Sequence, residues 1–170
     1  MSEETPEAVR DAAATRDALE PATDGYRVTT TRFDAWVTAT PSPTTDWATA
    51  FSVTVEVPTL SAVVDGDVGT AVEDGWLDTF ERRLDEASKA TRASVEPALS
   101  VAVTGDTVTV TYEFEFGSAD RGLDVAKTFV EYVEGTYVEG VVPGYDYQPP
   151  VSDLLSQAGQ GSGDRGGTPL

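Results

Sequence analysis

The chain has 170 residues, which is enough for one domain with a substantial hydrophobic core but not for two. Its 30 acidic and 11 basic residues give a net charge of −19, which argues against nucleic acids and anionic membranes as partners because both bind basic surfaces. With neither histidine nor cysteine, the chain cannot build a Ser-His-Asp triad, a Cys-His dyad, a thiolate or imidazole zinc site, or a disulfide. We therefore expect no cofactor.

The acidic residues also predict a compartment. They are spread along the whole chain rather than gathered in one tail, and all the basic residues except Lys89 and Lys127 are arginines. In multimolar salt the repulsion among these carboxylates is screened, and their hydration keeps the protein in solution. This composition favours a salt-in halophile, with an acidic mesophilic or partly disordered protein as the alternative.

The start of the chain and the length of its apolar stretches also bear on where the protein is located. The chain begins with Met1-Ser2-Glu3-Glu4, which is acidic where a signal peptide is basic. No stretch has the run of about 18 apolar residues that a membrane span needs. We therefore expect a cytoplasmic protein.

The first half of the chain predicts one helix followed by strands. Helix-starting residues and a run of alanines predict a helix over residues 5–19. Apolar and polar residues then alternate with period two, which predicts strands over residues 26–39 and 51–57. Residues 60–64 are compatible with a short third strand.

The second half predicts two helices around a hairpin. Apolar residues recur at helical spacing over residues 70–89 and again over residues 118–137. Between these helices, apolar residues stand at odd positions before the Gly105-Asp106 turn and at even positions after it. A two-residue turn there places Val103 opposite Val108, so the apolar sets of both strands share one face.

These elements predict an α+β fold, in which an antiparallel sheet of four or five strands has helices packed on one face, in the order α-β-β-(β)-α-β-β-α. This element order resembles that of type III secretion chaperones, a likeness that concerns the fold alone. We expect residues 1–140 to form a single α+β domain. Residues 141–158 would form a C-terminal tyrosine-proline strip with a short helix, and the glycine-rich residues 159–170 a disordered tail.

Two features are candidates for binding a partner. The tyrosine-proline strip places two tyrosines at i and i+2, on one side of an extended chain that a proline pair holds extended. It predicts a docking strip, an aromatic lid over a groove, or a segment that straps back across its own domain; its candidate residues are Tyr145, Asp146, Tyr147, Pro149 and Pro150. Trp36 stands on the polar face of its strand, which indicates either a binding surface or a core that wraps both sides of the sheet.

A third candidate is acidic. The predicted hairpin register puts Glu96 opposite Glu115, with Glu113 on the same face. Neighbouring carboxylates of this kind can recruit Mg²⁺ or divide acid and base roles between them. The alternative is a solvated strand face in molar salt.

Several short segments of the chain together resemble one known family. They are Phe33-Asp34-Ala35, Val57-Pro58-Thr59-Leu60, Glu73-Asp74-Gly75-Trp76, Thr79-Phe80-Glu81-Arg82-Arg83-Leu84, Phe129-Val130-Glu131-Tyr132-Val133-Glu134-Gly135-Thr136-Tyr137 and Pro143-Gly144-Tyr145-Asp146-Tyr147. The family that they resemble is an uncharacterised family of small haloarchaeal proteins, classed as a domain of unknown function. The resemblance spans about residues 7–158, implies a halophilic source, and carries no activity, ligand or catalytic residue.

Because the chain lacks most catalytic side chains, the leading hypothesis is a non-enzymatic protein-binding or adaptor module. It would hold a protein partner or a second copy of itself through the open sheet face or the tyrosine-proline strip. One alternative is a carboxylate- or metal-dependent hydrolase built on Glu96, Glu113 and Glu115. Another is a small-ligand carrier with a pocket between the helices and the sheet.

Overall fold

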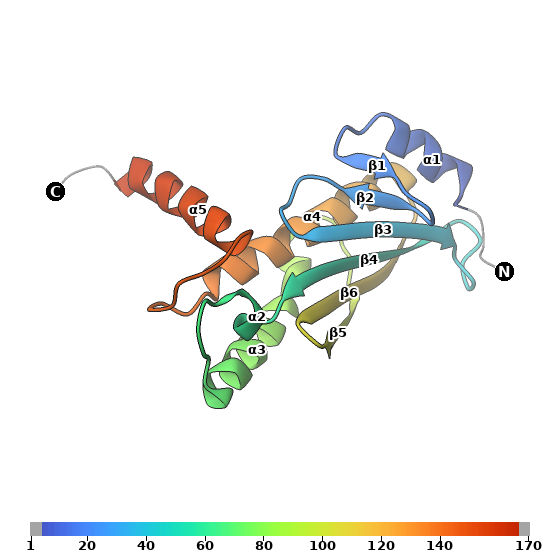
Figure 1. The fold of residues 1–170 in the computed structure, drawn as a ribbon. Coiled ribbons are helices and arrows are strands. Elements are labelled where there is room, and N and C mark those ends of the chain that lie inside the picture. Colours follow the sequence, from blue (N-terminus) through green and yellow to red (C-terminus); the bar gives the residue numbers. More distant parts are fainter. Residues whose placement is uncertain (1–4, 167–170) are drawn as a thin grey trace.

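The computed structural model describes the backbone of residues 5–166 and the side chains of residues 5–158. Six strands form one antiparallel sheet in the order β1-β2-β3-β4-β6-β5, and the long helix α4 lies across one face of it (Figure 1). The predicted α+β class is confirmed. The strands are β1 (Leu19–Pro21), β2 (Tyr26–Val28), β3 (Asp34–Pro41), β4 (Thr49–Pro58), β5 (Ala98–Thr104) and β6 (Thr107–Phe116). The helices are α1 (Glu7–Ala14), α2 (Leu60–Val63), α3 (Thr70–Leu84), the 3₁₀ turn η1 (Ala87–Ala90), α4 (Ala119–Glu139) and α5 (Val151–Gly166).

The sheet has six strands rather than the predicted four or five. The predicted strand over residues 26–39 is two strands, because the chain turns between β2 and β3 and sends Phe33 into the core at 4% exposure. Strand β1 has three residues, too few to show a period-two pattern, and it lies where the sequence predicts the end of the first helix. It forms because Leu19 pairs with Val28 of β2.

Residues 60–64 do not form the short strand with which their sequence is compatible. Residues 60–63 form the short helix α2, whose first turn is capped from two sides. The Thr59 side chain accepts a hydrogen bond from the Ala62 N–H at 3.2 Å. The Glu73 carboxylate of α3 accepts the N–H groups of Leu60 at 2.9 Å and Ser61 at 3.0 Å. These side chains satisfy backbone donors that a helix start leaves unpaired, and Glu73 comes from a separate helix.

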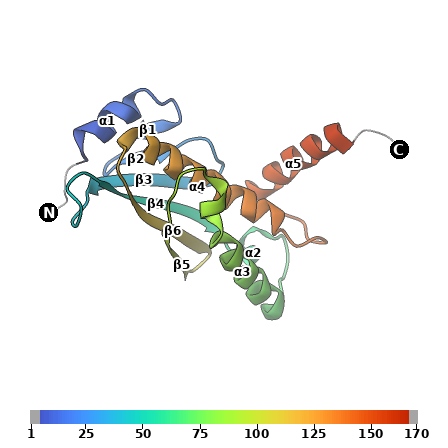
Figure 2. The same ribbon diagram turned by 180° about the vertical axis from the view of Figure 1, so that it is seen from behind.

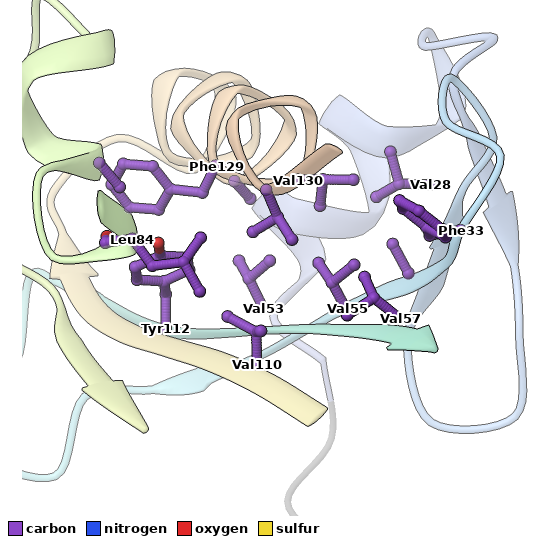
Figure 3. Close-up of a cluster of buried hydrophobic side chains, with 14 of the residues drawn as sticks. Val28, Phe33, Val53, Val55, Val57, Leu84, Val110, Tyr112, Phe129 and Val130 are labelled. Carbon is purple, nitrogen blue, oxygen red and sulfur yellow. Dashed lines mark hydrogen bonds between the residues drawn. The ribbon is translucent and has the colours of Figure 1, made fainter. Parts of the chain in front are cut away.

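The predicted hairpin register is confirmed: Thr104 pairs with Thr107 and Val103 with Val108. The apolar sides of β4 and β6 face α4, and Figure 3 shows Val53 and Val110 below Phe129 of that helix. Apolar side chains therefore fill the space between α4 and the sheet.

At its N-terminal end, α4 also holds α1. The Arg16 guanidinium donates to Asp120 Oδ1 at 2.8 Å and to Asp124 Oδ1 at 3.0 Å, both on α4. The Arg16 side chain is only 19% exposed, and Val9 of α1 is fully buried. The short first helix is thus fixed by contacts to a helix more than 100 residues later in the chain.

Helix α5 lies in the part of the chain, from residue 141 onward, that the sequence sets apart from the domain. Its backbone takes in residues 159–166, for which the sequence predicts a disordered tail, while residues 167–170 of that tail lie outside the described residues. Disorder of the tail stays a prediction. Among the helices that the structure describes, none has the length and apolar character needed to cross a membrane.

Glu134 of α4 gives the fold a measurable pH dependence. Its carboxylate accepts the Arg32 N–H at 2.6 Å, and burial raises the pKa of Glu134 above its ordinary value of 4.5. A carboxyl group with a raised pKa in the folded state stabilises the fold below its unfolded pKa. That contribution is lost as the pH rises through the folded pKa.

We therefore expect Glu134→Gln to become more stable relative to the wild type as the pH rises from about 4 to about 7. The amide keeps an acceptor for the Arg32 N–H but does not ionise. Urea unfolding at each pH, at constant high KCl, measures the difference. A gap between the two proteins that does not change with pH would contradict the assignment to Glu134.

Candidate functional site

One face of the sheet lies away from α4. It carries the polar positions of each strand, which alternate with the buried ones. Figure 1 looks onto the sheet with α4 behind it, and Figure 2 shows the molecule from the α4 side. We call this surface the open face; besides Trp36 and Arg27 its central positions hold small or acidic residues, namely Asp34, Thr38, Thr40, Ser52, Thr54, Glu56, Thr109, Thr111, Glu113 and Glu115.

Trp36 lies on this open face, as its place in the alternation predicts, and its side chain is half-buried. It pairs with Arg27 of β2 on one side and with Thr54 of β4 on the other. Arg27 donates to Asp34 Oδ1 at 3.1 Å, so an ion pair flanks the indole. We call Arg27, Asp34, Trp36, Thr38 and Thr54 the Trp36 patch. It offers one large apolar group within a rim of charged and hydroxyl groups.

A shallow hollow continues from the patch toward the end of the sheet. It has a volume of about 350 Å³, and Thr38, Pro43, Ser52 and Glu115 are among the residues that line it. Glu115 Oε1 accepts a hydrogen bond from the Ser42 hydroxyl at 2.9 Å, which ties the loop between β3 and β4 to β6. Side chains that donate hydrogen bonds would find acceptors here.

Trp47 is an exposed tryptophan that sequence reasoning did not single out. Trp47, in the loop between β3 and β4, is 76% exposed, and its ring lies close to Gly117 at the end of β6. Its position in a polar, proline-containing loop was a usable signal, because a large apolar residue there has no strand partner to pack on.

The predicted acidic cluster is only partly assembled. Glu113 and Glu115 are exposed on the open face of β6, where Glu113 pairs with Ser52 and Glu115 with Ala50. Glu96 is exposed but precedes β5, which begins at Ala98, so it takes no part in the ladder. Within residues 5–158 no group of three acidic side chains is placed to hold a metal ion together. The hydrolase alternative thus has no assembled ligand set in that part of the chain.

The tyrosine-proline strip lies against its own domain. Tyr147 forms an antiparallel bridge with Val64, Asp65 N–H donates to the Asp146 carbonyl at 2.8 Å, and Gln148 N–H donates to the Val63 carbonyl at 2.8 Å. The sequence left three arrangements open for this segment. These bonds match the one in which it straps back across its own domain.

The side chains of the strip differ in what they leave accessible. Tyr145 and Tyr147 are half-buried against the core, and the Tyr147 hydroxyl donates to the Val142 carbonyl. Burial raises the pKa of Tyr147 above its ordinary value. Asp146 and Pro149 are exposed, and Pro150 is half-buried. A partner could touch only the outer edge of this strip without displacing it.

The interior gives the carrier alternative little room. Trp76 and Tyr112, which would report a ligand between helices and sheet, are 5% and 1% exposed. The Tyr112 ring packs on Phe129 at a centroid distance of 5.0 Å, and its hydroxyl donates to the Leu84 carbonyl at 2.6 Å. Figure 3 shows Tyr112, Leu84 and Phe129 close together between α4 and the sheet.

Comparison with known families matches residues 14–157 to the Family of unknown function (DUF5813). No curated protein and no solved structure matches the chain, so the chaperone-like element order stays an analogy. Because the family match covers most of the sequence, the chain belongs to DUF5813, a family of unknown function.

Proposed function

We propose that this chain is a non-enzymatic protein-binding module in the cytoplasm of a salt-in halophile, and that it holds its partner through the Trp36 patch. The observation that carries the proposal is the open face itself: a half-buried tryptophan stands there between an ion pair and a row of threonines. Tryptophan and arginine are the residue types that most often dominate protein–protein binding energy.

The salt-rich setting is proposed from composition. A net charge of −19 is unfavourable in dilute buffer and tolerable where multimolar salt screens it. The likeness to small haloarchaeal proteins supports the same setting.

High salt also constrains the partner. Under strong screening, exposed ion pairs contribute little to the free energy of binding, whereas burial of apolar surface contributes more. The partner therefore needs an apolar pocket for the Trp36 indole, surrounded by groups that hydrogen-bond to Thr38 and Thr54. A flat, uncharged protein surface with one such pocket fits the patch.

The half-buried Trp36 and the exposed Trp47 supply a paired test. We expect Trp36→Thr to bind the partner at least about tenfold more weakly than the wild type does. A central aromatic anchor contributes about 2 kcal/mol or more to the free energy of binding. Threonine keeps the strand, because it favours β-structure and already occupies positions 38 and 54. Trp47→Thr, the same change at the 76% exposed loop tryptophan, serves as the control.

The measurement is capture of tagged wild type and both variants from halophile cytosol in near-saturated KCl, quantified by mass spectrometry. The captured protein is then titrated against each variant. Equal capture by Trp36→Thr and wild type contradicts the role of the patch. Absence of a stoichiometric partner contradicts the binding function and favours the small-ligand or hydrolase alternatives.

A further inference from the structure

The two edges of the sheet differ in how they are protected from pairing. Edge strands are usually kept short or carry charge or proline, since their free N–H and C=O groups otherwise bind another strand. Strand β1 follows this rule: it has three residues, among them Glu20 and Pro21. Strand β5, at the other edge, has seven residues and pairs only with β6 among the described strands.

Strand β5 has none of these protective features. Residues 97–105 carry no charged side chain, although acidic residues are spread through the rest of the chain, and residues 98–104 include no proline. Val103 is 48% exposed, while Leu99 and Val101, on the same side of the strand, are half-buried. Figure 1 shows β5 as the border of the sheet.

From this edge we infer that two copies of the chain pair through β5, in antiparallel orientation, to form one continuous twelve-stranded sheet. The number of strands follows from two copies of the six-stranded sheet. The occupant is a second copy because the edge is neutral: two chains of charge −19 repel each other least when the strands that meet carry no charge. The pairing is independent of the Trp36 patch, whose residues lie on β2, β3 and β4 and are separated from β5 by β6.

Symmetry sets the register. A twofold axis perpendicular to the sheet relates two antiparallel copies of the same strand. Full overlap of residues 98–104 places that axis at Val101, which then lies opposite Val101 of the second copy. Leu99 lies opposite Val103, so all three apolar residues of each copy meet on one face.

A hollow beside the edge leaves room for the second copy's side chains. It has a volume of about 350 Å³ and lies between α3 and β5, where Leu99 and Val101 form its apolar part. Its α3 side carries Asp78, Glu81 and Asp85, with Arg82 among them. In the dimer these acidic helix faces approach each other, so salt strengthens the association by screening them.

We expect sedimentation velocity to give a dimer at about 3 M KCl and a monomer at about 0.3 M KCl, at the same protein concentration. Val103→Lys places a charge on the edge and should shift the high-salt sample to monomer. Val72→Lys is the matched control: it makes the same change at a valine that is 37% exposed on α3, and it should stay dimeric.

A cross-link tests the register. Because the natural chain has no cysteine, Val101→Cys carries a single thiol. Directly opposed residues have Cα atoms about 4.5–5.5 Å apart, within the range that a disulfide spans. Mild oxidation in high salt should link Val101→Cys into a covalent dimer, and should not link Thr104→Cys, whose thiols lie at opposite ends of the paired strands.

The inference is overturned if the wild type stays monomeric in high salt, or if Val103→Lys remains as dimeric as Val72→Lys. Circular dichroism of each variant confirms that it is folded. A Trp36→Thr protein that loses its partner but still dimerises would keep this inference separate from the proposed function.

Discussion

A chain that ends at Gly140 is expected to be far less stable than one that ends at Ala158. The shorter chain loses Val151 and Leu154, which are 0% and 6% exposed in the full protein. Burying two such side chains contributes about 1.5–3 kcal/mol each. Because a domain of this size is stable by only about 5–15 kcal/mol in total, the loss is a large fraction of its stability.

The backbone contacts of the tyrosine-proline strip add to this loss. Without residues 141–158, the Asp65 N–H and the Val63 carbonyl lose their partners in the strip. Urea unfolding of the two truncated chains, each compared with the full chain at constant high KCl, measures the effect. We expect the chain ending at Ala158 to unfold as the full chain does.

Neighbouring leucines of α5 allow a sharper test of the same point. Leu154 is 6% exposed and belongs to the core, whereas Leu155 is half-buried at its margin. We expect Leu154→Ala to cost about 2–5 kcal/mol and Leu155→Ala clearly less. If the chain ending at Gly140 proved as stable as the full chain, the strip would be a separate segment, available for docking as the sequence alone allows.

The second large effect is expected from Gly122→Ala in α4. A Cβ atom added at Gly122 would lie 2.4 Å from Cε2 and 2.5 Å from Cζ of Phe51, which is much closer than carbon atoms approach. Phe51 cannot move aside easily, because it is 2% exposed and stacks on Phe114 at a centroid distance of 5.3 Å. Overpacking of this kind costs about 1–3 kcal/mol.

This loss should appear although alanine favours helices over glycine by about 1 kcal/mol. Gly135, on the exposed side of the same helix, provides the control because its added Cβ meets nothing within 4 Å. We expect Gly135→Ala to raise the free energy of unfolding by about 0.4–1 kcal/mol.

A double variant confirms the cause. Phe51→Leu removes the ring that an alanine at position 122 would strike, so Gly122→Ala should cost less in the Phe51→Leu background than in the wild type. Parallel losses in both backgrounds would show that the effect has another origin. Thermal and urea unfolding at fixed salt concentration supply the four free energies of the cycle.

Local patterns predicted much of the sheet correctly. The hairpin of β5 and β6 was predictable because two apolar alternations agree with a two-residue turn, and a shift by one residue would reverse the faces of one strand. Helices α3 and α4 were predictable because their apolar stripes run for several turns. Trp36 could be placed on the open face because apolar and polar residues alternate along its strand.

Elements that depend on distant contacts could not be predicted in this way. Strand β1 is too short to carry a pattern and exists through its pairing with β2. The sequence of residues 60–64, taken alone, is compatible with a strand. Residues 60–63 form helix α2 instead, and Glu73 of a different helix supplies part of its cap. Glu96 was predicted to pair with Glu115. The pairing of β5 with β6 stops at Ala98, opposite Glu113, so Glu96 lies two residues outside it.

The sequence by itself determined the charge, the absence of thiol and imidazole chemistry, the α+β class and the register of the hairpin, because each follows from composition or from local periodicity. Only the tertiary structure decided that the tyrosine-proline strip binds its own domain and that β5 is left as an unprotected edge. Both depend on which segments meet across the chain, and this is set by the packing of the whole core rather than by any short stretch of residues.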